Sequence, residues 1–244
     1  MDVSVVIACY NEEPVLVANV REIMDILDQT TYRYEVILAD DGSTDSTVTL
    51  IEGLAEQYPC ISYLIHPVNM GRGRTVADGI RKARGRVVGF IDIDLQTPAH
   101  YLPRLIREIE QGADVAIARR IFKLSSHVLG RWILSKGYMV LSSWVLGVKR
   151  RDTESGCKFF RREAILPILE EVQDPHWFWD TEIMALAAHR GLTIVEVPTV
   201  FLREVSTRSS VRIVRDVIHY GLNLFRFRRR MGHKLRATNP RKKL

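Results

Sequence analysis

The chain has 244 residues, 46% of them hydrophobic, and a formal net charge of +6. This length and composition allow one sizeable buried core. The sequence has no apolar run long enough for an ordinary membrane-spanning helix, and it shows no internal repeat or low-complexity segment. Three scattered cysteines, Cys9, Cys60 and Cys157, argue against a disulfide framework and against a zinc site. With no signal peptide before the first apolar run, they favour a reducing, cytoplasmic location.

Short apolar runs alternate with helical patterns through the first half of the chain. We expect strands at residues 3–8, 34–39, 61–65 and 87–91. The first helix should end near Leu27, Ser43 should cap the second, and the third should end at Ala83. Thr97-Pro98 should open a fourth helix, in cap and first-position order, running to about Gln111. This alternation predicts an α/β fold with a mostly parallel, twisted sheet and helices on both faces.

Two acids follow the buried run 87–91, in the segment Asp92-Ile93-Asp94-Leu95-Gln96. If the extended conformation continues, Asp92, Asp94 and Gln96 lie on the same side. Two carboxylates on one side repel each other unless a cation joins them. A divalent ion that takes oxygen ligands and keeps places for substrate phosphates fits that need.

Other polar residues stand at the carboxyl ends of the predicted strands, where ligands of such sheets bind. They are Glu12 after the first strand, Asp40 and Asp41 after the second, and Asn69 after the third. The sequence therefore predicts a polar ligand site along this edge. A dehydrogenase is disfavoured, because no Gly-x-Gly-x-x-Gly follows the first strand.

Four motifs in this order resemble the family 2 glycosyltransferases, which have the GT-A fold. They are Cys9-Tyr10-Asn11-Glu12-Glu13, Asp40-Asp41-Gly42-Ser43-Thr44-Asp45, Asn69-Met70-Gly71-Arg72-Gly73 and Asp92-Ile93-Asp94-Leu95-Gln96. The Asp-Leu-Gln ending and the later segment 152–160 look like the branch that makes dolichyl- or polyprenyl-phosphate sugars. We expect a catalytic domain over residues 1–210 and a basic amphipathic helix and tail over 211–244.

The resemblance implies roles for residues at the strand ends. Nucleotide-binding residues would be Ala8, Tyr10, Glu12, Asp40, Asp41, Asn69, Gly71, Arg72 and Asp92. Asp92, Asp94 and Gln96 would surround a Mg²⁺ or Mn²⁺ ion that binds the donor diphosphate, with Asp94 as a direct ligand of the ion. Arg72 departs from the lysine of many members, which changes the donor geometry there. The donor would be GDP-mannose or UDP-glucose, and the product would be inverted.

The charge of the chain is divided unevenly. Residues 1–118 carry 10 Lys+Arg and 18 Asp+Glu, or −8, whereas residues 119–244 carry 25 and 11, or +14. A basic half suits phosphates or an acidic membrane surface. Two aromatic-rich segments, residues 132–146 and 217–230, have helical period, and the second ends in clustered Arg. We therefore expect peripheral binding to the cytoplasmic face of a membrane.

A lipid phosphate acceptor is already anionic near neutral pH, so it needs cations more than it needs a general base. Candidate acceptor-binding residues are Arg119, Arg131 and Arg203, because one guanidinium group can bind two phosphate oxygens at once, and with them Ser135. In the resembling branch, arginines in such segments bind the acceptor, so Arg131 and Arg203 join Asp94 as residues assigned to catalysis.

Two other functions stay open. A soluble saccharide or protein acceptor would need a carboxylate base, for which Asp180 or Glu182 is available. Alternatively, both acids serve the helix N-terminus, and His176 and Cys157 are packing residues. A non-catalytic nucleotide- or nucleic-acid-binding protein would use the basic tail. No nucleic-acid motif is present, so we expect no nucleic-acid partner.

Overall fold

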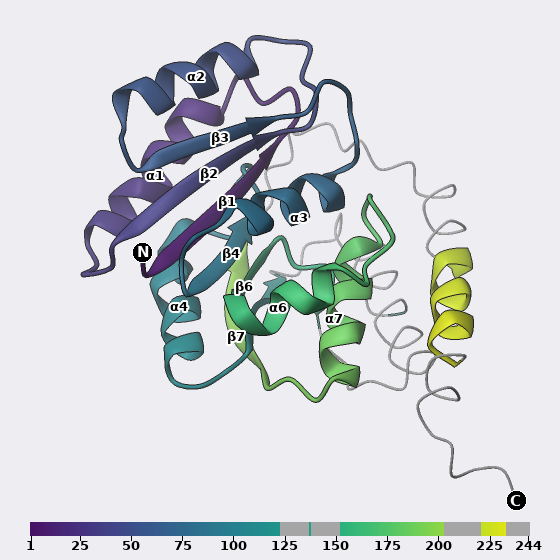
Figure 1. Cartoon of the computed structure of the whole chain (residues 1–244). Helices are drawn as coiled ribbons and strands as arrows, with labels where there is room; N and C mark the ends of the chain where they lie inside the picture. The colour runs from purple at the N-terminus through teal and green to yellow at the C-terminus, as the bar shows by residue number, and fades with distance from the viewer. Residues whose placement is uncertain (123–136, 138–151, 203–220, 233–244) are drawn as a thin grey trace, which may run out of the picture. The chain divides into compact units, whose positions relative to one another are not determined.

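The structure is a computed structural model that describes residues 1–122, 137, 152–202 and 221–232 (Figure 1). The chain divides into two compact units, Met1–Leu124 with Asp152–Arg203, and Ser125–Arg151 with Glu204–Leu244. In the second unit, the described residues 221–232 are helical. The predicted boundary at residue 210 stays a prediction. Within the described ranges, no helix is both long and apolar enough to span a bilayer.

The first unit alternates strands and helices along the sequence. In chain order these are β1 (Val3–Cys9), α1 (Leu16–Asp28), β2 (Tyr34–Asp40), α2 (Thr47–Gln57), β3 (Ile61–Ile65), α3 (Arg72–Lys82), β4 (Val87–Ile91), the 3₁₀ turn η1 (Ala99–Tyr101), α4 (Leu102–Glu110), β5 (Val115–Phe122), β6 (Cys157–Arg161), α6 (Arg162–Leu169), α7 (Trp179–His189) and β7 (Ile194–Phe201). The four strands predicted in the first half of the chain are confirmed.

The seven strands form one sheet in the order β3-β2-β1-β4-β6-β5-β7. β6 runs antiparallel to β4 and β5, and the other neighbouring pairs are parallel. Cys9 pairs with Asp40, and Val6 pairs with Phe90. The loops that follow β1, β2 and β4 therefore leave the same edge of the sheet, and this edge carries the predicted ligand site.

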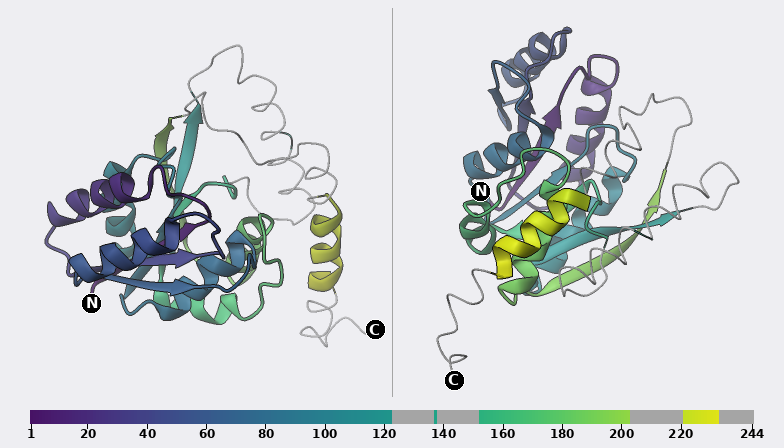
Figure 2. Two further views of the ribbon diagram at one scale, coloured as in Figure 1. Left: turned by 90° about the horizontal axis from the view of Figure 1, so that it is seen from above. Right: turned by 90° about the vertical axis from the view of Figure 1, so that its right-hand side faces the viewer.

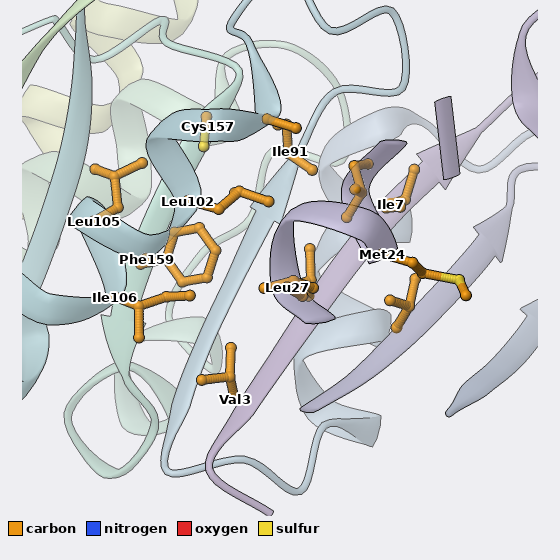
Figure 3. Packing of buried hydrophobic residues seen from close by; sticks show 14 of the residues in the cluster. Val3, Ile7, Met24, Leu27, Ile91, Leu102, Leu105, Ile106, Cys157 and Phe159 are labelled. Atoms are coloured by element: carbon orange, nitrogen blue, oxygen red, sulfur yellow. The ribbon is translucent and has the colours of Figure 1, made fainter. Parts of the chain in front are cut away.

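Helices cover both faces of the sheet (Figures 1 and 2). One hydrophobic cluster joins the sheet to α1, α2 and α4, and it includes Leu27, Leu105, Val3 and Phe159 (Figure 3). Helices α3, α6 and α7 cover the other face. There, Trp179 of α7 meets Phe90 of β4 edge-on, with 5.8 Å between the ring centroids. This contact brings α7 close to the strand that precedes the two acids.

Two predicted helix starts are wrong. Ser43 does not cap α2, because its hydroxyl donates to Asp40 and the helix begins at Thr47, whose N–H donates to Asp45 at 3.0 Å. Thr97-Pro98 does not open the fourth helix either. Pro98 precedes η1, and α4 begins only at Leu102. In both places the chain adds a turn at the ligand edge before the helix starts.

Candidate active site

Three carboxylates gather where β1 and β4 end. Glu12 follows β1, and Asp92 and Asp94 follow β4. Loss of hydration, together with the charges of Asp94 and Asp92, raises the pKa of Glu12 to about 7. Loss of hydration and the charge of Asp92 also raise the pKa of Asp94. The structure thus brings the three acids together, and the charge of Asp92 disfavours the ionised forms of Glu12 and Asp94.

The strand does not continue through these acids as predicted. β4 ends at Ile91, and a turn follows in which Leu95 has a φ of 47° and its N–H donates to the carbonyl of Asp92 at 3.2 Å. The N–H of Gln96 donates to Asp94 at 3.2 Å. The two carboxylates are neighbours because of this turn, not because of strand alternation. The role of Gln96 at a metal stays a prediction.

The donor set fits a divalent cation that shares its coordination with a substrate. Within the described ranges, no group of three or more His, Cys, Asp or Glu side chains forms a complete metal cage. Mg²⁺ and Mn²⁺ suit carboxylate oxygens, and Mg²⁺ typically uses one or two carboxylates plus substrate phosphates. The raised pKa values of Glu12 and Asp94 mark a local excess of negative charge that such a cation would relieve.

Arg72, at the start of α3, contacts this acidic group. Its Nε donates to Asp92 Oδ1 at 3.0 Å and its Nη1 donates to Asp180 Oδ2 at 2.7 Å. Its side chain is 13% exposed. Burial alone would lower the pKa of Arg72, but Asp92 and Asp180 raise it. The guanidinium therefore stays charged and faces the acid that closes β4.

Asp40 and Asp41 are buried and hold the loops of the site. Asp40 accepts hydrogen bonds from the N–H groups of Gly42 and Ser43, both at 2.9 Å. Asp41 accepts from the N–H groups of Met70 at 2.7 Å and Gly71 at 3.0 Å. These contacts tie the loop after β2 to itself and to the loop before α3. Direct contact of either acid with a nucleoside stays a prediction.

The remaining predicted nucleotide-binding residues line the same edge. Ala8 is half-buried in β1, Tyr10 is 46% exposed, and Asn69 is exposed. Gly71 has a φ of 98°, and a Cβ there would collide with His176 and with the carbonyl of Pro175. Only glycine suits this position, because it has both an unusual backbone angle and a close neighbour.

Of the predicted acceptor-binding residues, only Arg119 lies in the described part of the chain. It is exposed on β5, and within the described residues its side chain has no hydrogen-bond or ion-pair partner. Arg131, Ser135 and Arg203 lie outside the described residues. The next residue, Arg120, was not predicted, and it donates to Asp152 through Nε at 2.9 Å and Nη2 at 2.6 Å.

The acids considered as a general base have structural partners. Asp180 accepts from Arg72 and from Lys158, and Glu182 accepts the N–H groups of Gln173 at 3.1 Å and Asp174 at 2.9 Å. Both side chains are buried in the first turn of α7. Cys157 is fully buried, as expected of a packing residue. These contacts favour the structural interpretation of Asp180 and Glu182.

Comparison with known proteins identifies relatives of this chain. The family described as "Glycosyl transferase family 2" matches residues 4–168. The chain is 30% identical to the glycosyltransferase AglD of Haloferax volcanii over 231 residues, which are 93% of this chain and 37% of that protein. It is 28% identical to the dolichyl-phosphate beta-glucosyltransferase ALG5D of Trichomonas vaginalis, covering 93% of this chain and 76% of that protein.

A solved structure supports the fold. Glucosyl-3-phosphoglycerate synthase from Mycobacterium tuberculosis, in complex with Mn²⁺, uridine diphosphate and glucosyl-3-phosphoglycerate, superposes with a TM-score of 0.65. It is 20% identical, and the match covers 93% of this chain and 78% of that one. The GT-A fold expected from the sequence is confirmed, with its mixed sheet and helices on both faces.

Proposed function

Because the chain belongs to glycosyl transferase family 2, we propose that this glycosyltransferase moves a hexose from a nucleoside-diphosphate sugar to a polyprenyl or dolichyl phosphate. The donor is GDP-mannose or UDP-glucose, and the reaction inverts the anomeric centre and depends on Mg²⁺ or Mn²⁺. The acceptor lies in a membrane whose surface the enzyme binds.

The observation that carries this proposal is the grouping of Glu12, Asp92 and Asp94 beside the buried Arg72. Carboxylates alone would repel a diphosphate. Binding of a phosphate by a guanidinium alone would not explain why three acids lie beside Arg72. The combination suits a diphosphate that arrives with a divalent cation, because the acids bind the cation and Arg72 offers donors to phosphate oxygens.

Asp94, with Asp92 beside it, would hold the cation. A bound Mg²⁺ or Mn²⁺ neutralises charge on the leaving nucleoside diphosphate. The side chains Tyr10 and Asn69, exposed at the ends of β1 and β3, are available to the nucleoside. Asp40 and Asp41 keep the surrounding loops in place through their hydrogen bonds.

The acceptor is proposed to be a phosphate because Arg119 has no side-chain partner among the described residues, whereas the two candidate bases are engaged. Arg119 is exposed, whereas Asp180 and Glu182 already accept hydrogen bonds from cations or backbone N–H groups. A phosphate monoester attacks as an anion and needs no proton removed at neutral pH. We propose that Arg131, Ser135 and Arg203, which lie outside the described residues, join Arg119 in binding it.

Helix 221–232 supports the proposed membrane surface. Leu222 is 50% exposed and Phe225 is 58% exposed, and Arg226 and Arg229 share their face by helical spacing. Leu224 and Phe227, on another face, are buried. A helix face that combines exposed apolar side chains with arginines suits the interface of an anionic bilayer.

The test is incubation with a panel of UDP- and GDP-sugars, a short polyprenyl phosphate and Mg²⁺ or Mn²⁺, read by mass spectrometry. We expect one donor to give a hexosyl polyprenyl phosphate, and excess chelator to remove that product. Transfer to a soluble saccharide without any lipid phosphate product would replace the proposal with the soluble-acceptor function.

A further inference from the structure

A lysine lies fully buried behind the candidate active site. Lys158 stands in β6, and its side chain is 0% exposed. Its Nζ donates to Asp180 Oδ1 and to the carbonyl of Ser155, each at 2.5 Å, and lies 5.1 Å from the centroid of the Phe90 ring. Burial lowers the pKa of Lys158, and the Asp180 carboxylate counteracts this by favouring the ammonium. Buried ion pairs are weak contributors to stability, so this one invites a functional explanation.

Asp180 connects this lysine to the active site. One carboxylate oxygen accepts from Lys158, and the other accepts from Arg72 at 2.7 Å. Arg72 in turn donates to Asp92 Oδ1 through Nε at 3.0 Å and Nη2 at 2.5 Å. Four alternating charges therefore run from the interior of the sheet to the acid that closes β4.

The surroundings leave Arg72 and Asp92 little freedom. The Arg72 guanidinium carbon lies 5.3 Å from the ring centroids of both Phe90 and Trp177. The N–H of Asp92 donates to the carbonyl of Gly156 at 2.8 Å, and a Cβ on Gly156 would collide with Asp92 Oδ2. One oxygen of Asp92 is thus held by Arg72, and the other rests against a glycine.

The charges of this row cancel. Lys158 and Arg72 carry one positive charge each, and Asp180 and Asp92 carry one negative charge each, so their sum is zero. Without Lys158, the row would carry one excess negative charge, and Asp180 would compete more strongly with Asp92 for Arg72. The direction in which the Arg72 N–H groups point therefore depends on how strongly Asp180 and Asp92 each attract the guanidinium.

We infer that Lys158 and Asp180 are positioning residues that fix Arg72, and through it Asp92, for the donor diphosphate. This inference rests on the proposed function, because it concerns the same site. It also assigns Asp180 to the orientation of a cation and not to proton removal.

The test is a double-mutant cycle that combines Lys158→Met with Arg72→Lys. If Lys158 acts through Arg72, Lys158→Met lowers kcat/KM for the donor about 10- to 100-fold in the wild type, the usual loss when the group that orients a ligand is removed. In the Arg72→Lys background the same substitution costs less than about threefold, because a lysine cannot donate to Asp92 and Asp180 in the same paired way. Lys82→Met, a substitution at an exposed lysine of α3, leaves kcat/KM unchanged.

A second measurement separates this inference from the proposed function. The wild type, the two single variants Lys158→Met and Arg72→Lys, and the double variant are titrated with UDP and GDP in the presence of Mn²⁺ by calorimetry. This measurement needs no acceptor and no turnover. The inference predicts the same non-additivity in nucleotide affinity even where no transfer is found. If Lys158→Met does not fold by circular dichroism, Asp180→Asn replaces it in the cycle. Equal losses in both backgrounds would mean that Lys158 and Asp180 do not act through Arg72, and would overturn the inference.

Discussion

The pKa of Glu12 reports the repulsion among the carboxylates of the active site. Its carboxyl has a pKa of about 7 against an ordinary value of 4.5, mainly through lost hydration and then through Asp94 and Asp92. Between these pH values the unfolded chain has lost the proton and the folded protein keeps it, so stability falls as pH rises from 4.5 to 7. Above that range both states are ionised and no further loss occurs.

Glu12→Gln removes this penalty and is therefore expected to stabilise the protein at pH 8 in the absence of divalent cations. The shift from 4.5 to about 7 corresponds to at most about 3 kcal/mol. Because Glu12 is partly exposed, solvent screening reduces the expected gain to about 1–2 kcal/mol. Within the described residues, the Glu12 carboxyl makes no hydrogen bond that glutamine would lose.

The assay is urea unfolding of the wild type and Glu12→Gln at pH 8 and pH 4.5 with EDTA present. The gain should appear at pH 8 and shrink at pH 4.5, where the wild-type carboxyl is protonated in the folded state. Glu22→Gln, at an exposed position of α1, controls for a general change in charge. A Glu12→Gln variant that is less stable than the wild type at pH 8, or equally shifted at both pH values, would refute the argument.

Three further variants test other parts of the protein. Asp94→Asn is expected to abolish transfer and Mn²⁺ binding while the circular dichroism spectrum persists; full activity would contradict a ligand role. Asp40→Ala removes an acceptor of two N–H groups and should weaken nucleotide binding by about 1.5–3 kcal/mol, measured by calorimetry. Unchanged nucleotide affinity would contradict a role of Asp40 in nucleotide binding. Replacing Arg228, Arg229 and Arg230 by glutamine should reduce sedimentation with anionic liposomes yet spare transfer to a short acceptor in detergent; unchanged sedimentation would argue against docking through this helix.

The strands of the first half could be predicted because each is a short apolar run between turn residues. Val3–Cys9 and Val87–Ile91 are buried on both faces, so their sequences are almost continuously apolar. The sequence predicts the starts of α2 and α4 too early, because Ser43 and Thr97 are residue types that commonly cap helices. Ser43 instead bonds to Asp40, three residues earlier, in a local turn that competes with helix capping.

The acids of the site could be predicted, but their arrangement could not. Strand alternation predicts the side on which Asp92 and Asp94 lie only while the strand continues. The left-handed backbone conformation of Leu95, in the turn after the strand, has no signal in the sequence. The neighbours of Asp180 are also invisible there, since Lys158 is 22 residues and Arg72 is 108 residues away along the chain. In the sequence, a lysine that directly precedes Phe159 and Phe160 in Cys157–Arg161 is a sign of a buried ion pair.

The central claim is that the acceptor is a lipid phosphate. The most direct test compares farnesyl phosphate with farnesol, which share the hydrocarbon chain and differ in the phosphate, under the same donor and Mn²⁺. Mass spectrometry is expected to detect a hexosyl product with farnesyl phosphate and none with farnesol, because a phosphate is already anionic near neutral pH, whereas the farnesol hydroxyl needs a general base and the two acids considered for that role, Asp180 and Glu182, are engaged in hydrogen bonds. A product from farnesol at a comparable rate, or transfer to a soluble saccharide and to neither lipid, would contradict the claim.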